Sequence, residues 1–183
     1  GHPQTAWAMG EFRRYSSGVW PAVSLDAIRL EVLRTLQAAK SERIRPTASQ
    51  LGSVVELARV RVAQPKETWD ANSDVLVCAN GTLHIPTREL MPHNPNNWAT
   101  AGVPYAYAPA ADAPVWRYHV ATTTPDAGGL LQEYAGYCLT ADTRFELALW
   151  LVGERGSGKS TTVMGFQTLL GPRAGVLGLA DIE

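Results

Sequence analysis

The alternation of apolar and polar positions predicts two amphipathic helices in the first third of the chain. Apolar residues recur every three or four positions over residues 25–40, and again from residue 47 to about residue 62. Ser24 can cap the first helix, and Thr47 with Gln50 forms a capping-box pattern at the start of the second. Because a short basic loop separates the two segments, we expect a helical hairpin.

Two β-hairpins are expected beside these helices. Over residues 11–20, aromatic ends flank a Ser-Ser-Gly turn. In VLVCANGTLHI, two β-rich arms flank Asn80-Gly81, which is the strongest short signal for a type I′ turn. Six prolines between residues 86 and 114 then argue against a helix and predict an extended segment, in which VPYAYAP can supply a short edge strand.

The last third changes to longer apolar runs. Residues 127–143 favour a helix that ends near Leu139, and residues 145–152 are nearly all apolar, as in a strand buried on both faces of a parallel sheet. Lys159 to Leu170 fits a helix that Gly171 and Pro172 stop. The expected fold class is α/β: an α+β region followed by the first strand, loop and helix of a P-loop ATPase.

The loop between that strand and that helix carries GERGSGKS, which matches the GxxxxGK[ST] pattern known as the P-loop or Walker A motif. Its glycines let successive N–H groups point inward at an anion, and the helix dipole adds positive potential. The candidate nucleotide-binding residues are Gly153, Gly156, Ser157, Gly158, Lys159, Ser160 and Thr161.

The motif assigns roles within this loop and predicts ATP and Mg²⁺ as cofactors. Lys159 would contact the β- and γ-phosphates, Ser160 would hold Mg²⁺, and Thr161 could reach the α-phosphate. Lys159 and Ser160 are therefore the candidate catalytic residues. The alternative is a glycine-rich turn that binds only adventitious anions.

Hydrolysis needs more than this loop. An acidic residue at the end of a neighbouring strand must hold Mg²⁺ and orient water. Asp181 and Glu183 follow the helix too closely to lie on another strand, so we expect this acid, the phosphate sensor and the arginine finger beyond Glu183. The 183-residue chain alone is then expected to hydrolyse no ATP.

Charge divides the chain, although the net charge is only −1. Residues 1–66 carry twice as many Lys and Arg as acidic residues, whereas residues 67–183 carry half as many. A basic half indicates a polyanion partner such as DNA, and the alternative is a solvated helical surface with spare arginines. The candidate nucleic-acid residues are Arg13, Arg14, Arg29, Arg34, Arg43, Arg45, Arg59 and Arg61.

Aromatic residues and cysteines add less specific signals. The aromatic side chains could stack on bases, but their apolar neighbours favour packing in the core instead; they are Trp7, Trp20, Trp98, Trp116 and Tyr105. No apolar run reaches membrane-spanning length and no signal-peptide core is present, which favours a cytoplasmic protein with Cys78 and Cys138 as free thiols.

Four segments occur in an order that resembles a known family. They are RRYSSGVW before a helix, CANGTLHIPTRELMPHNP, VPYAYAPAADAPVW, and LLQEYAGYCLTADTRFELALWLVGERGSGKS. In this order they resemble the phage, plasmid and poxvirus-type primase–helicases, whose motor is a superfamily 3 helicase. The resemblance covers most of residues 11–175.

The resemblance implies a fragment of a mobile-element replicative DNA helicase-primase, and it implies a division of the chain. Residues 1–10 would be a tag remnant or tail, residues 11–143 a linker domain, and residues 144–183 the truncated start of the ATPase. The linker would comprise a basic helical part (11–66), a proline-rich β part (67–126) and a helix (127–143).

The resemblance also implies partners: single-stranded or forked DNA, self-association into a hexameric ring, no membrane, and the host-cell cytoplasm as location. Two other hypotheses stay open. One is an assembly or oligomerisation module without DNA contact of its own. The other is part of a different P-loop NTPase, such as a kinase or a packaging motor.

Overall fold

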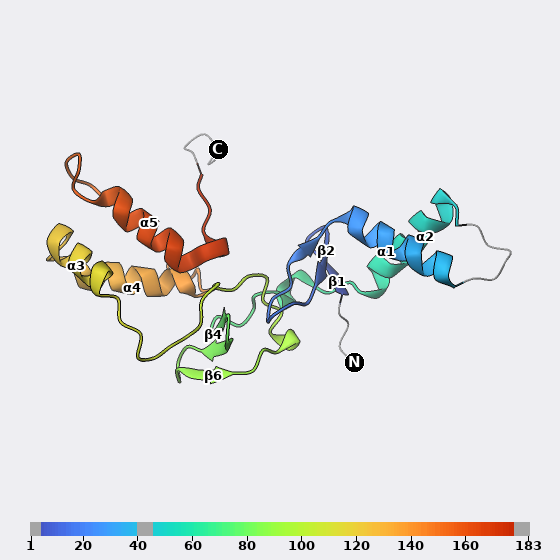
Figure 1. The fold of residues 1–183 in the computed structure, drawn as a ribbon, viewed down its shortest axis with the longest axis horizontal. Coiled ribbons are helices and arrows are strands. Elements are labelled where there is room, and N and C mark those ends of the chain that lie inside the picture. Colours follow the sequence, from blue (N-terminus) through green and yellow to red (C-terminus); the bar gives the residue numbers. More distant parts are fainter. Residues whose placement is uncertain (1–4, 40–45, 178–183) are drawn as a thin grey trace. The chain divides into compact units, whose positions relative to one another are not determined.

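The computed structural model describes residues 5–39 and 46–177, and it confirms a mixed α/β chain with two small antiparallel sheets and five α-helices (Figure 1). The chain divides into two compact units. The first comprises Gly1–Ala71 and Pro95–Thr100, and the second comprises Asn72–Asn94 and Ala101–Glu183.

The sheet of the first unit is antiparallel, in the order β1 (Thr5–Ala8), β2 (Glu11–Arg14) and β3 (Ala22–Val23). Ser17 and Gly18, with φ of 49° and 90°, turn the chain between β2 and β3, so the hairpin predicted over residues 11–20 is confirmed. Thr5–Ala8 were expected to belong to a tail over residues 1–10, but they form β1 instead. Met9 and Gly10 supply a second turn with positive φ, which pairs β1 with β2 and buries Ala6 and Ala8.

The predicted helical hairpin is confirmed as α1 (Leu25–Ala38) and α2 (Ala48–Arg61), which pack against each other. Ser24 caps α1, and the capping box of Thr47 and Gln50 is formed in both directions. Ile28 of α1 and Val55 of α2 are buried against Phe12 of β2. The inward stripes therefore hold the helices on the sheet.

Three tryptophans from distant parts of the chain form the other half of this core. Trp20 stacks on Trp98 with ring centroids 4.8 Å apart, and both meet the edge of Trp69. The Trp20 indole N–H donates to the Pro95 carbonyl at 3.0 Å. These side chains pack in the core, as their apolar neighbours favour.

The second unit contains β4 (Val75–Cys78), β5 (Gly81–His84) and β6 (Glu89–Met91) as an antiparallel meander. The predicted hairpin is confirmed, but its turn is displaced by one residue. Cys78 pairs with Gly81, so the two loop residues are Ala79 and Asn80, neither with positive φ. The Asn80 amide is used instead to hold Tyr107, accepting from its N–H and donating to its carbonyl.

The edge strand expected in VPYAYAP is not formed, although this segment does lie beside β4. Val103 N–H donates to the Val77 carbonyl and Ala79 N–H donates to the Tyr105 carbonyl, at 2.8 and 2.9 Å. These two bonds cover the free edge of β4 without a continuous ladder. Pro104 lacks an N–H, so it cannot donate to such a ladder.

Three helices follow: α3 (Pro114–Thr123), α4 (Gly128–Leu139) and α5 (Lys159–Leu170). The helix expected over residues 127–143 ends at Leu139, and the one from Lys159 to Leu170 is confirmed. Helix α3 was not predicted, because the density of prolines up to Pro114 argued against a helix there. A proline at the first helical position is well tolerated, since its missing N–H has no intrahelical partner there.

The buried strand expected over residues 145–152 is not formed. The segment pairs with neither sheet, and Trp150 and Val152 are 83% and 91% exposed. A strand of a parallel sheet is buried only when neighbouring strands flank it, and the described residues place none beside this one. Within residues 5–39 and 46–177, no helix has the length and apolarity to cross a membrane.

Candidate nucleotide-binding site

The GERGSGKS loop leads directly into α5. Gly156 and Gly158 have φ of 84° and 86°, on either side of Ser157, whose φ is not positive. Gly158 is the residue that precedes the first turn of α5, and no side chain caps the N–H groups of that turn. Alternating backbone conformations of this kind direct N–H groups into a concavity that suits an anion.

Lys159 lies folded over this loop. Its ammonium donates to the carbonyl oxygens of Gly153 and Glu154, at 2.8 and 2.6 Å, and to the Ser157 hydroxyl at 3.1 Å. Each of the three N–H groups of the ammonium therefore has an oxygen acceptor. An anion bound in the concavity would offer the ammonium a charged acceptor in place of these neutral ones.

Two side chains of α3 pack against the start of α5. A Cβ built on Gly158 would lie 2.7 Å from Thr123 Cγ2 and 3.0 Å from His119 Cε1. His119 Nε2 also forms a hydrogen bond, 3.0 Å long, with the hydroxyl of the buried Thr162. Gly158 is thus required by both its positive φ and its neighbours.

Ser160 and Thr161 occupy the first turn of α5 and are exposed. Thr161 lines a groove between α5 and α3. Among the described residues, no group of three or more His, Cys, Asp or Glu side chains is arranged to hold a metal ion. Asp181 and Glu183 lie outside the described residues.

Neither cysteine lies in this loop. Both Cys78 and Cys138 are free thiols. Burial raises the pKa of the Cys78 thiol, which keeps it protonated and poorly nucleophilic.

The structure places the candidate nucleic-acid arginines in different surroundings. The side chain of Arg13 is only 12% exposed, donates to the Trp20 carbonyl and lies over the Trp69 ring. It is a core residue and cannot reach a phosphate without leaving this position. Arg14 binds both carboxylate oxygens of Glu31, at 2.7 and 2.6 Å.

Two more of these arginines form short-range pairs on their own helices: Arg29 with Asp26 on α1, and Arg59 with Glu56 on α2. Arg59 also lies over the Trp7 ring. Within the described part of the chain, Arg34 and Arg61 are the members of this set for which no ion pair is found, and both are exposed. Arg43 and Arg45 lie outside the described residues.

Three neighbours of the loop were not predicted from the sequence: His119, Thr123 and Thr162. Only Thr162 is close to the motif in sequence, and nothing in the pattern distinguishes it from any other helix residue. The two α3 residues could not be found because α3 itself was not predicted.

The family model described as D5 N terminal like matches residues 8–125. The chain belongs to this family. The D5 N-terminal-like domain is found in phage and viral primase–helicase proteins, as the resemblance implied. No curated protein matches the chain. The D5 N-terminal-like match includes α3 and therefore His119, whereas the GERGSGKS loop and α5 follow it.

Proposed function

We propose that the chain is part of a mobile-element replicative primase–helicase, in which it links the primase to an ATP-driven, hexameric superfamily 3 helicase. The observation that carries this proposal is the order of two features: a D5 N-terminal-like domain over residues 8–125, followed by a phosphate-binding motif at the start of α5.

In this proposal the loop holds the phosphates of ATP. The N–H groups around Gly156 and Gly158 and the N-terminus of α5 would bind phosphate oxygens, and Lys159 would leave its loop carbonyls to contact the β- and γ-phosphates. Ser160 would hold Mg²⁺, which neutralises charge on the phosphates. The uncapped first turn and the positive φ at both glycines support the fit.

Calorimetric titration of the chain with Mg–ATP tests the loop. Binding should be seen and should be lost in Lys159→Ala, because one charged donor to the phosphates is removed. Lys66→Ala, at an exposed lysine of the first unit, is the matched control and should bind like the parent chain. Equal binding by both variants would exclude Lys159 from the site.

The 183-residue chain itself should show no ATP turnover, since hydrolysis needs an acidic residue on a strand next to the loop, and the described residues place no strand there. Turnover that Lys159→Ala abolishes would contradict this expectation. In the complete primase–helicase, turnover should be stimulated by single-stranded DNA. Lys159-dependent turnover that ignores DNA would favour another P-loop enzyme, such as a kinase or packaging motor.

A second candidate function is an assembly module without DNA contact. Leu57 and Val60, one turn apart on α2, are 72% and 71% exposed, and four of the candidate arginines are engaged within the chain. A second copy of the chain would cover this apolar pair. Sedimentation should then show self-association that Leu57→Glu with Val60→Glu abolishes. A monomeric parent chain at all concentrations would exclude this function for α2.

A further inference from the structure

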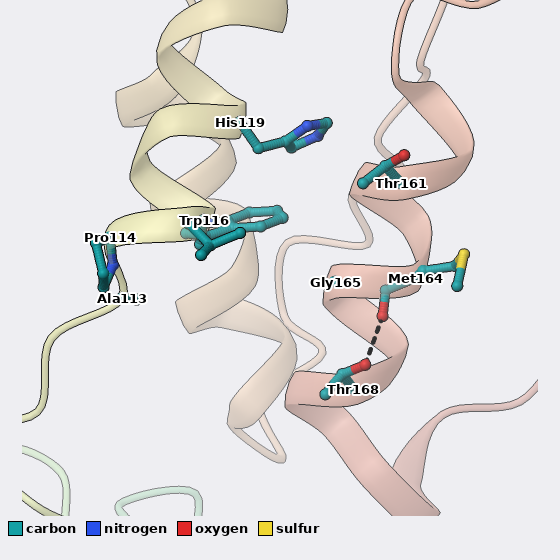
Figure 2. Close-up of a pocket in the computed structure, with 9 residues that line it drawn as sticks. Ala113, Pro114, Trp116, His119, Thr161, Met164, Gly165 and Thr168 are labelled. Carbon is teal, nitrogen blue, oxygen red and sulfur yellow. Dashed lines mark hydrogen bonds between the residues drawn. The ribbon is translucent and has the colours of Figure 1, made fainter.

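A groove between α3 and α5 adjoins the phosphate-binding motif (Figure 2). It has a volume of about 500 Å³, and its walls include Trp116 and His119 from α3 and Thr161, Met164 and Gly165 from α5. This volume lies within the range of small-ligand sites. The mouth is open, since Val115 and Met164 on its rim are 81% and 64% exposed.

One end of the groove lies at the first turn of α5, next to the loop. Thr161 lines the groove and directly follows Lys159 and Ser160 of the motif. His119 lines it from the other side, and its ring lies against Gly158 and Thr162. A ligand that extends from the loop past Thr161 therefore enters the space between α3 and α5.

The walls suit a flat, weakly polar group. Trp116 is held against α5 because position 165 is glycine: a Cβ there would lie 2.4 Å from Trp116 Cζ3. The His119 ring lies 5.6 Å from the Trp116 ring, centroid to centroid. Polar atoms are few, contributed by His119, Thr161 and Thr168. Aromatic side chains in such a setting bind nucleobases by stacking.

We infer that this groove holds the base and ribose of the nucleoside triphosphate whose phosphates the loop binds, with Trp116 as the surface on which the base stacks. The inference rests on the proposed nucleotide binding and adds to it the part of the ligand that α3 recognises. It gives α3, the last helix of the D5 N-terminal-like match, a direct role in holding the nucleotide.

The test compares Mg–ATP with inorganic tripolyphosphate, which carries the phosphates without base or ribose. The parent chain should bind ATP about tenfold more tightly, in keeping with the strength of one base stacked on an aromatic side chain. Trp116→Leu should lose this advantage and bind tripolyphosphate as the parent does. Trp150→Leu is the comparison variant and should keep it, because Trp150 does not line this groove but a different cavity, next to Lys159.

The outcomes separate the inference from the proposed function. If neither compound binds, the phosphate loop fails and the inference fails with it. Equal affinities in the parent chain, or an equal loss of both affinities in Trp116→Leu, overturn the inference and leave the phosphate loop standing. Loss of the ATP advantage in Trp150→Leu alone would place the base on residues 145–152 and also overturn it.

A second measurement needs no variant, in case Trp116→Leu fails to fold. ATP with an azide on the purine ring, photolysed on the parent chain, should label residues 114–119 or 161–168. Labelling confined to other residues would overturn the inference. Competition by unmodified ATP checks that the label marks the same site.

Discussion

His119 connects two helices through one side chain. Its ring contacts Gly158 and bonds the hydroxyl of Thr162, which is only 2% exposed. A buried hydroxyl that loses a partner costs free energy, and here the Gly158 carbonyl, 3.3 Å away, remains as an acceptor. The loss should therefore be small but measurable.

We expect His119→Ala to lower the free energy of unfolding by about 1 kcal/mol, which corresponds to a melting temperature lower by about 2–4 °C for a chain of this size. His84→Ala is the control, because His84 bonds Thr87 on an exposed turn. Circular dichroism measures the melting temperatures of both variants and the parent chain. Equal melting temperatures for His119→Ala and the parent chain would contradict the proposed contact.

The pair of Arg14 and Glu31 joins β2 to α1 through two short hydrogen bonds. Hydrogen bonding to Arg14 is the main cause that lowers the pKa of Glu31 below its ordinary 4.5. A carboxyl group whose pKa is lowered by folding stabilises the fold above its ordinary pKa. This stability disappears as the pH falls through the lowered value.

We expect Glu31→Gln to melt below the parent chain near neutral pH. The difference should be at most about 1 kcal/mol, because Glu31 is half exposed and water screens the pair. The two melting temperatures should converge as the pH falls well below 4.5. A difference that is constant over this acid range would show that the charge pair is not its cause.

At the scale of elements, α3 and α5 approach each other at Gly165. The Trp116 ring occupies the space that a side chain at position 165 would need. A methyl group there must displace the indole or separate the helices. A Cβ added to Gly136, in the middle of α4, would meet no atom within 4 Å.

Substitution of each of these two helical glycines by alanine gives a variant and its control. Gly165→Ala should destabilise the chain by about 1–3 kcal/mol, as other overpacked contacts do. Gly136→Ala should stabilise it by about 0.5–1 kcal/mol, because alanine loses less backbone entropy in a helix. Urea unfolding measures both. If Gly165→Ala were also stabilising, the close approach of Trp116 to α5 would be wrong.

The elements that were predicted from sequence are those with local signals. The capping box at Thr47 and the cap at Ser24 define their helices without help from distant residues. Strand β1 was missed because its partner β2 and the Met9-Gly10 turn, rather than its own four residues, determine it. The apolar run over residues 145–152 shows the reverse: its composition suits a buried strand, but burial depends on neighbours that the described residues do not provide.

The part of the candidate site that could be predicted is likewise the part with a local sequence signal. Gly153 to Thr161 are contiguous, so one motif finds them. His119 and Trp116 approach the loop only because α3 packs on α5, and such a contact has no signature in the sequence. The arginine set was chosen by charge alone, which does not reveal that Glu31 or the Trp69 ring already engages its members.

At the scale of the whole molecule, the basic half has fewer available charges than its composition indicates. Arg13, Arg14, Arg29 and Arg59 interact within the chain. Arg34 and Arg61 have no ion pair among the described residues, and Arg43 and Arg45 lie outside them. If Arg43 and Arg45 contact DNA together with Arg34 and Arg61, this set makes about four phosphate contacts.

The number of phosphate contacts can be measured from the salt dependence of binding to single-stranded DNA. With about four contacts, the logarithm of the association constant should fall with the logarithm of salt concentration at a slope of about −3. Charge reversal at Arg43 and Arg45 should weaken binding, whereas Arg29→Ala should not. A slope near twice this value would mean that the paired arginines also contact DNA, and no binding at low salt would support the assembly module.

The polypeptide passes from one compact unit to the other at residues 71/72, 94/95 and 100/101. The short return over Pro95–Thr100 supplies the carbonyl that Trp20 bonds and the ring of Trp98 that stacks on it. A gene fragment that ends at residue 71 would therefore encode an incomplete core. Recombination between genes of this family is expected to exchange residues up to Thr100 as one block, because a junction at residue 71 would separate Trp20 from Trp98.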